Sequence, residues 1–164
     1  MTTELHPLGF FLPENTRLLM LGSFPPPKAR WSMDFYYPNI QNDMWRILGL
    51  IFYGNKDAFL RDKKAFSEEK AKAFCREKGI GIGDTAMEVI RLKANASDKF
   101  LEVVRPIDPE KVLSQIPECV AIVVTGQKAM DTLLSVLPGT ESGLLVGIFL
   151  YGKDDEAVPY AFIL

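Results

Sequence analysis

The residues of this chain best suited to chemistry are amides and aromatics gathered in one segment. Prolines and aromatics fill Phe24–Gln41, and Asn42 follows directly. Tyr36 and Tyr37 can stack on a nucleobase, since every base offers a π-face, or they can pack the segment onto the core. Asn39 and Asn42 carry paired donors and acceptors that read a base edge or cap a helix. Since long loops on a rigid scaffold tend to carry function, the pattern favours a binding site here.

Other familiar chemistries are excluded by residue type and spacing. We expect the single histidine, His6, to lie in a mobile N-terminal segment, which argues against a His-based triad or a zinc site. Cys75 and Cys119 are far apart and without CxxC neighbours, so they are interpreted as structural thiols. Gly79–Gly83 lacks the spacing of a dinucleotide fingerprint, and no phosphate-binding P-loop pattern occurs.

Three apolar runs that end in small or polar residues must position these groups. The predicted strands are Arg17–Ser23, Ile80–Thr85 and Val120–Gly126. In a parallel sheet, ligands bind beyond the carboxyl ends of the strands. The segments expected to converge there are Gly22–Pro27, Gly83–Thr85 and Thr125–Lys128.

Helices alternate with these strands. The predicted helices are one opened by Asn42, one over Ser67–Lys78 capped by Ser67 and stopped by Gly79, and two over Pro109–Gln115 and Gln127–Val136. This alternation predicts an α/β fold: a three-layer α/β/α sandwich around a short central parallel sheet, in one domain spanning residues 1–164.

Six segments, in this order along residues 10 to 137, share the pattern of one family. They are Leu21–Pro25, Phe35–Tyr37, Asn42–Leu48, Gly83–Thr85, Asn95–Asp98 and Thr125–Ala129. The ordered set resembles the uracil-DNA glycosylase superfamily, and within it the branch that includes hypoxanthine and mismatch-specific glycosylases. Pro26, Met44 and Asn39 depart from that branch, where glycine, phenylalanine and histidine are usual, so the preferred base stays open.

The resemblance implies excision of a flipped uracil or hypoxanthine from DNA, without cofactor or metal. The residues it points to are Asn42 and Ser23 for catalysis; Gly22, Phe24, Pro25, Tyr36, Tyr37, Asn39 and Asp84 for base binding; and Lys28, Arg30, Gln127 and Lys128 for DNA contact. Asn42 would hold the water or the base, while backbone N–H groups of Gly22–Phe24 stabilise the departing anion. For Asp84, a strand-end cap is favoured over a general base.

The C-terminal segment 138–164 is atypical for that family, whose relatives carry a Tyr-Arg-x-Pro-Ser-Ser-Ser-Arg motif near their end. Here the chain ends in an acidic segment and an apolar tail. Codons for 156–164, read one base later, admit Lys-Leu-Tyr-Arg-Met-Pro-Ser-Ser. We therefore hypothesise a one-base frameshift, natural or introduced in sequencing or cloning, between about residues 138 and 153. Weak DNA binding and low or absent activity would follow, because acidic residues repel phosphate. Leu144–Leu150 still has the apolar character of a last strand.

Composition fits a globular protein of ordinary kind. The 164 residues are 48% hydrophobic and 24% charged, with a net charge of −2, which argues against a protein that coats nucleic acid but allows a local phosphate grip. We expect a cytoplasmic monomer that contacts damaged DNA and no membrane. Two alternatives stay open: a nucleic-acid or nucleotide-binding module of the same fold without turnover, and an α/β enzyme acting on small nucleotides.

Overall fold

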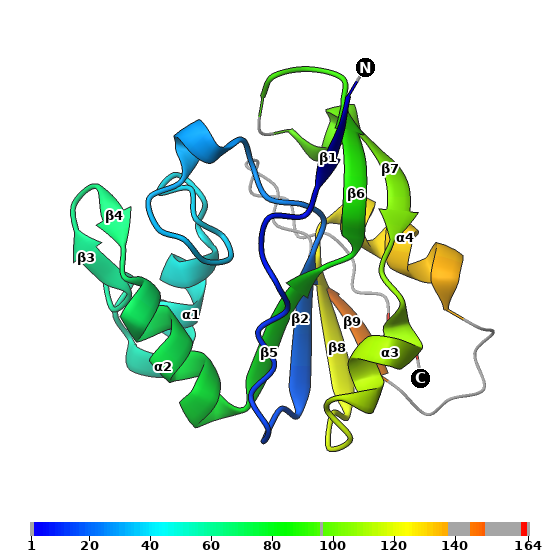
Figure 1. Cartoon of the computed structure of the whole chain (residues 1–164). Helices are drawn as coiled ribbons and strands as arrows, with labels where there is room; N and C mark the ends of the chain where they lie inside the picture. The colour runs from blue at the N-terminus through cyan, green and yellow to red at the C-terminus, as the bar shows by residue number, and fades with distance from the viewer. Residues whose placement is uncertain (1, 96, 138–144, 150–161, 164) are drawn as a thin grey trace.

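The structure, a computed structural model, describes residues 2–95, 97–137, 145–149 and 162–163. Its centre is a five-stranded sheet in the order β10-β9-β8-β2-β5. Figure 1 shows β9, β8, β2 and β5 of this sheet side by side. The strands are β2 (Leu18–Gly22), β5 (Ile80–Asp84), β8 (Ala121–Thr125), β9 (Leu145–Phe149) and β10 (Phe162–Ile163). All pairs are parallel except β9 with β10. The three predicted strands are thus confirmed, with β2 between the other two.

Helices cover both faces of this sheet. They are α1 (Met44–Tyr53), α2 (Glu68–Lys78), α3 (Pro109–Ser114) and α4 (Gln127–Val136). Because side chains alternate along a strand, Met20 joins the buried cluster under α1 and α2, whereas Leu19 and Leu21 join the cluster under α3 and α4. Figure 1 shows the two pairs of helices on opposite sides of the sheet. The predicted three-layer sandwich is confirmed.

The helix ends follow local chemistry. The Ser67 side chain accepts a hydrogen bond from the Lys70 N–H at 3.2 Å, and Gly79 ends α2 in the left-handed region at φ 67°, as predicted. The prediction that Asn42 opens the first helix, with Asp43 in the first turn, was wrong by one residue, because the N-cap residue is Asp43. The helix begins at Met44, and Asn42 instead accepts the Met44 N–H through its Oδ1 at 2.9 Å.

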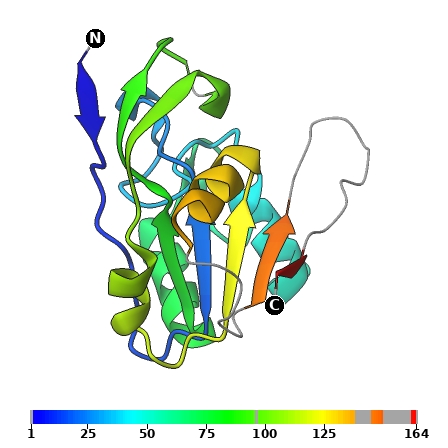
Figure 2. The same ribbon diagram turned by 90° about the vertical axis from the view of Figure 1, so that its right-hand side faces the viewer.

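A second, antiparallel sheet stands at the carboxyl end of the central one and was not predicted. Its order is β1-β6-β7, from β1 (Thr3–Leu5), β6 (Ala86–Arg91) and β7 (Leu101–Pro106) (Figure 2). Only Thr85 separates β5 from β6, so the chain passes directly from one sheet into the other. Short elements complete the fold: β3 (Leu60–Asp62), β4 (Ala65–Phe66) and the 3-10 helices η1 (Lys28–Arg30) and η2 (Asp98–Phe100).

The N-terminal segment is held in place, so the prediction of a mobile segment around His6 was wrong. Strand β1 pairs with β6, and the His6 N–H donates to the Met87 carbonyl at 2.8 Å. Further along, Phe11 forms an isolated antiparallel bridge with Ile82. These partners lie between 71 and 87 residues away in the sequence, and no local pattern indicates such pairing.

The atypical segment 138–164 lies largely outside the described residues, and with it the hypothesised frameshift. Within it the structure describes β9 and β10. Strand β9 forms where the apolar stretch Leu144–Leu150 predicted a last strand.

Candidate functional site

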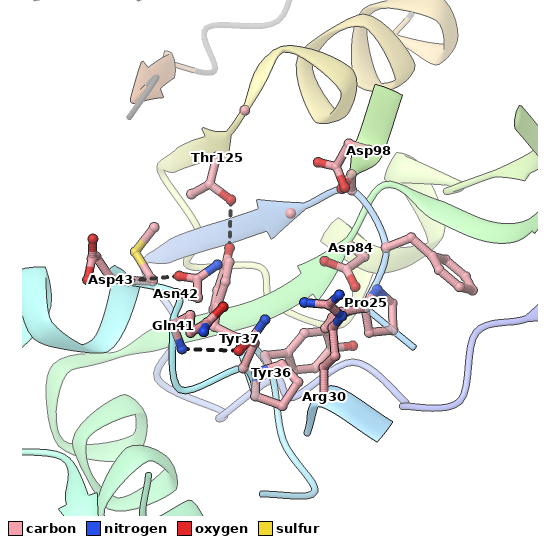
Figure 3. Close-up of a pocket in the computed structure, with 18 of the residues that line it drawn as sticks. Pro25, Arg30, Tyr36, Tyr37, Gln41, Asn42, Asp43, Asp84, Asp98 and Thr125 are labelled. Atoms are coloured by element: carbon pink, nitrogen blue, oxygen red, sulfur yellow. Dashed lines mark hydrogen bonds between the residues drawn. The ribbon is translucent and has the colours of Figure 1, made fainter. Parts of the chain in front are cut away.

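A cavity of about 580 Å³ opens at the carboxyl end of β2, β5 and β8 (Figure 3). The predicted site residues that line it are Gly22, Ser23, Phe24, Pro25, Arg30, Tyr36, Tyr37, Asn39, Asn42 and Asp84. Thr125 and Gly126 from the end of β8 join them. The predicted convergence of three strand ends is therefore confirmed.

Gly22 forms a part of the wall where no side chain fits. A Cβ atom there would lie 2.5 Å from Asp84 Oδ1, 3.4 Å from the Tyr37 hydroxyl and 3.6 Å from Thr125 Oγ1. Gly22 pairs with Asp84 across the β2–β5 ladder, which explains the close approach. The missing side chain leaves these three polar groups around one space.

Asp84 is paired with the N-terminal histidine. His6 Nε2 lies 2.7 Å from Asp84 Oδ2, and the two side chains are 5% and 7% exposed. The His6 ring packs edge-on against Phe24, with ring centres 5.2 Å apart. The prediction of a mobile segment around His6 gave no sign of this contact, because the position of His6 depends on the pairing of β1 with β6.

The tyrosine pair is fixed by hydrogen bonds from both hydroxyls. Tyr36 is buried and donates to the Gly9 carbonyl at 3.1 Å. Tyr37 has a left-handed backbone at φ 51° and shares a 2.8 Å hydrogen bond with Thr125. Burial, reinforced by the charge of Asp84, raises the pKa of both hydroxyls, so both stay protonated. A left-handed non-glycine residue at a cavity is strain of the kind found at functional sites.

Asn42 lines the cavity, and the oxygen of its side-chain amide is already hydrogen-bonded within the protein. Its Oδ1 accepts the Met44 N–H, whereas its NH₂ group bonds to no described residue and is open to a ligand. The Asn42 N–H donates to the Asn39 carbonyl at 2.9 Å. Trp45, fully buried, donates to the Tyr36 carbonyl at 2.9 Å and ties this loop to α1. The Asn42 amide is thus presented from a fixed turn.

Asp98 lines the same cavity from η2, and no role in the site was predicted for it. Burial raises the pKa of its carboxyl, and the negative charge of Asp84 raises it further. A hydrogen bond from the Ser23 side chain and the charge of Lys128 act in the opposite direction. The only signal in the sequence was its place in the Asn95–Asp98 segment of the family resemblance.

Only one of the four predicted DNA-contact residues lines the cavity. Arg30 lines the cavity, and so does Lys99, which was not predicted, whereas Lys28, Gln127 and Lys128 lie outside its lining. Lys28 pairs with Asp34 and lies 3.9 Å above the Trp31 ring. The Gln127 amide bonds to Asp131 on its own helix at 2.7 Å, and Lys128 lines a smaller hollow with Val103 and Pro106.

Within the described ranges, no group of three histidine, cysteine, aspartate or glutamate residues is placed to hold a metal ion. Cys75 and Cys119 are free thiols, and burial raises the pKa of Cys75 to about 12. Across the same ranges, no helix has the length and apolarity to span a membrane.

The chain and its fold were compared with known families, proteins and solved structures. No protein-family model and no curated protein matches the chain. A solved structure from Methanosarcina acetivorans, described as a "putative Uracil DNA glycosylase", matches with a TM-score of 0.60 and 25% identity. The match covers 78% of this chain and 73% of that one. The fold is uracil-DNA glycosylase-like. This likeness supports the resemblance of the ordered motifs to the uracil-DNA glycosylase superfamily. The cavity of this chain lies at the strand ends that carry those motifs.

Proposed function

We propose that this chain is a DNA glycosylase of base-excision repair. It hydrolyses the N-glycosidic bond of a deaminated base, uracil or hypoxanthine, after the nucleotide has been flipped out of the duplex. It acts as a monofunctional hydrolase, as a monomer in the cytoplasm, and needs no cofactor.

One observation carries this proposal: a single cavity joins the Gly22–Pro25 turn, the Asn42 amide, Asp84 and the Tyr36–Tyr37 pair. Its volume of about 580 Å³ accommodates a purine or a pyrimidine with its sugar. The likeness to a solved structure described as a glycosylase adds support from a separate direction.

Backbone donors at the end of β2 suit a departing base that carries negative charge. The carbonyls of Gly22 and Ser23 accept hydrogen bonds from the N–H groups of Thr85 and Ala86, at 2.8 and 3.1 Å. In a trans peptide the N–H points opposite to the carbonyl. The N–H groups of Ser23 and Phe24 therefore point away from that segment, and neither has a backbone acceptor among the described residues. Fixed N–H groups of this kind stabilise an anion as it forms.

The Asn42 NH₂ group is suited to hold either an oxygen of the base or the attacking water. Water adds to the sugar carbon as the bond to the base nitrogen breaks, and the base leaves as an anion. The proton that the water loses balances the one that the base takes up, which leaves a neutral base and a sugar hydroxyl. Tyr37, partly exposed at the cavity, offers the ring surface for stacking. Phe24 and Tyr36 are nearly buried, so they support the wall more than they expose a face.

The proposal is tested by base release from labelled oligonucleotides that contain uracil, hypoxanthine or xanthine. The chain is compared with a version in which the hypothesised frame is restored. We expect release of uracil or hypoxanthine, faster with the restored version because a basic, hydroxyl-rich segment would replace the acidic one. The strand should break only after alkali, since a monofunctional enzyme leaves an intact abasic site.

An undamaged oligonucleotide of the same sequence is the control. No release by either version, or cleavage of free deoxyinosine without action on DNA, would contradict the proposal. Strand breakage before alkali would contradict the monofunctional mechanism alone.

A further inference from the structure

The histidine at the end of β1 is built into the wall behind the cavity. The His6 side chain is 5% exposed, and its ring lies against Phe24 and Tyr36, with ring centres 5.2 and 5.9 Å away. It is not among the residues that line the cavity. Its side-chain hydrogen bond to the cavity lining is the one to Asp84, at 2.7 Å.

The surroundings of His6 fix the direction of this bond. A carboxylate only accepts hydrogen bonds, so His6 Nε2 donates to Asp84 Oδ2. On the other side of the ring, Nδ1 lies 3.1 Å from the Leu8 nitrogen and 2.7 Å from the Leu8 carbonyl oxygen. A neutral ring accepts from the first, and a charged ring donates to the second. In either state Nε2–H stays on Asp84.

The second oxygen of Asp84 is left for the cavity. No donor among the described residues bonds to Oδ1, and Asp84 lines the cavity. The space in front of Oδ1 exists because residue 22 has no side chain, since a Cβ there would lie 2.5 Å away. Figure 3 shows the Asp84 carboxyl among the groups that surround the cavity.

We infer that His6 is a positioning residue that holds Asp84 Oδ1 as a hydrogen-bond acceptor for the base, and that this acceptor selects a ring N–H. Deamination creates such a group, because the acceptor N3 of cytosine becomes N3–H in uracil and N1 of adenine becomes N1–H in hypoxanthine. In cytosine and adenine the same ring nitrogen carries a lone pair instead of a hydrogen. A carboxylate oxygen held in one orientation would face that lone pair with its own, and the two would repel. The inference rests on the proposed function and adds to it the means of recognition.

The test compares His6→Leu with His6→Gln, whose amide NH₂ can replace Nε2–H. Single-turnover release of uracil is expected to fall about 10–100-fold in His6→Leu, the usual loss when an orienting partner is removed. His6→Gln should stay within a few-fold of the unaltered protein. Leu5→Ala, at an exposed position on the same strand, should be silent.

Binding of free uracil and free cytosine, followed by NMR at the Gly22 and Asp84 amides, separates recognition from catalysis. The unaltered protein should prefer uracil, and His6→Leu should lose that preference. Equal losses in both His6 variants with a lowered Tm, full activity in both, or no preference in the unaltered protein would overturn the inference. Selective uracil binding without base release would contradict the proposed glycosylase activity and still support the role of His6 in recognition.

Discussion

Asp84 and Asp98 bring two carboxyl groups to one cavity, and their surroundings set them apart. Asp84 has the His6 ring as a donor at 2.7 Å. Asp98 has its pKa raised, chiefly by burial and next by the charge of Asp84. The folded state therefore favours the protonated form of Asp98.

Replacing Asp98 by asparagine should stabilise the protein at neutral pH. Because the folded-state pKa of Asp98 is raised, folding holds its proton more tightly than the unfolded chain does, and stability is lost as pH rises above the unfolded value of about 3.9. An asparagine side chain carries no charge, so Asp98→Asn should raise Tm by a few degrees at pH 7. Thermal unfolding from pH 4 to pH 8 measures this gain, which should shrink toward pH 4.

Asp57→Asn is the matched control for the unfolding measurements from pH 4 to pH 8. Asp57 is exposed, so its replacement removes no buried charge and should leave Tm unchanged. A gain for Asp98→Asn that is equally large at pH 4 would show that the charge is not its cause.

At the scale of elements, the joint between α2 and β5 positions the strand that ends in Asp84. Gly79 has φ 67°, and its carbonyl accepts hydrogen bonds from the N–H groups of Arg17 and Leu18, at 2.8 and 3.2 Å. A Cβ on Gly79 would lie 2.7 Å from the Asn15 carbonyl oxygen. One glycine thus sets the start of both β5 and β2.

Gly79→Ala should cost clearly more than Gly54→Ala. Both glycines are left-handed, at φ 67° and 62°, but a Cβ on Gly54 meets nothing within 4 Å. Gly54→Ala should therefore cost only the conformational penalty, about 1–2 kcal/mol. Gly79→Ala adds a backbone clash and should cost at least about 1 kcal/mol more. Urea unfolding measures both, and equal losses would show that the Asn15 contact relaxes freely.

At the scale of the whole molecule, local patterns predicted the central sheet, its helices and the meeting of three strand ends. They did so because short apolar runs, the Ser67 cap and the Gly79 stop are local signals. The antiparallel sheet was missed because β1 pairs with β6 across more than eighty residues, and most residues of its strands are not fully buried. His6 was missed for the same reason. Of the site, the residues on β2, its loop and β5 were predictable, whereas the partners of Asp84 were not.

The measurement that tests the central claim most directly is single-turnover base release by Asn42→Ala beside the unaltered chain, with DNA binding measured in parallel. The substrate is an oligonucleotide with one uracil or one hypoxanthine. If the Asn42 amide holds the water or the base during bond cleavage, release should fall about 100–1,000-fold while binding of the damaged strand is kept, the loss seen when one fixed donor is removed. Unchanged release in Asn42→Ala, or binding without any release by both the unaltered chain and the frame-restored version, would contradict the account.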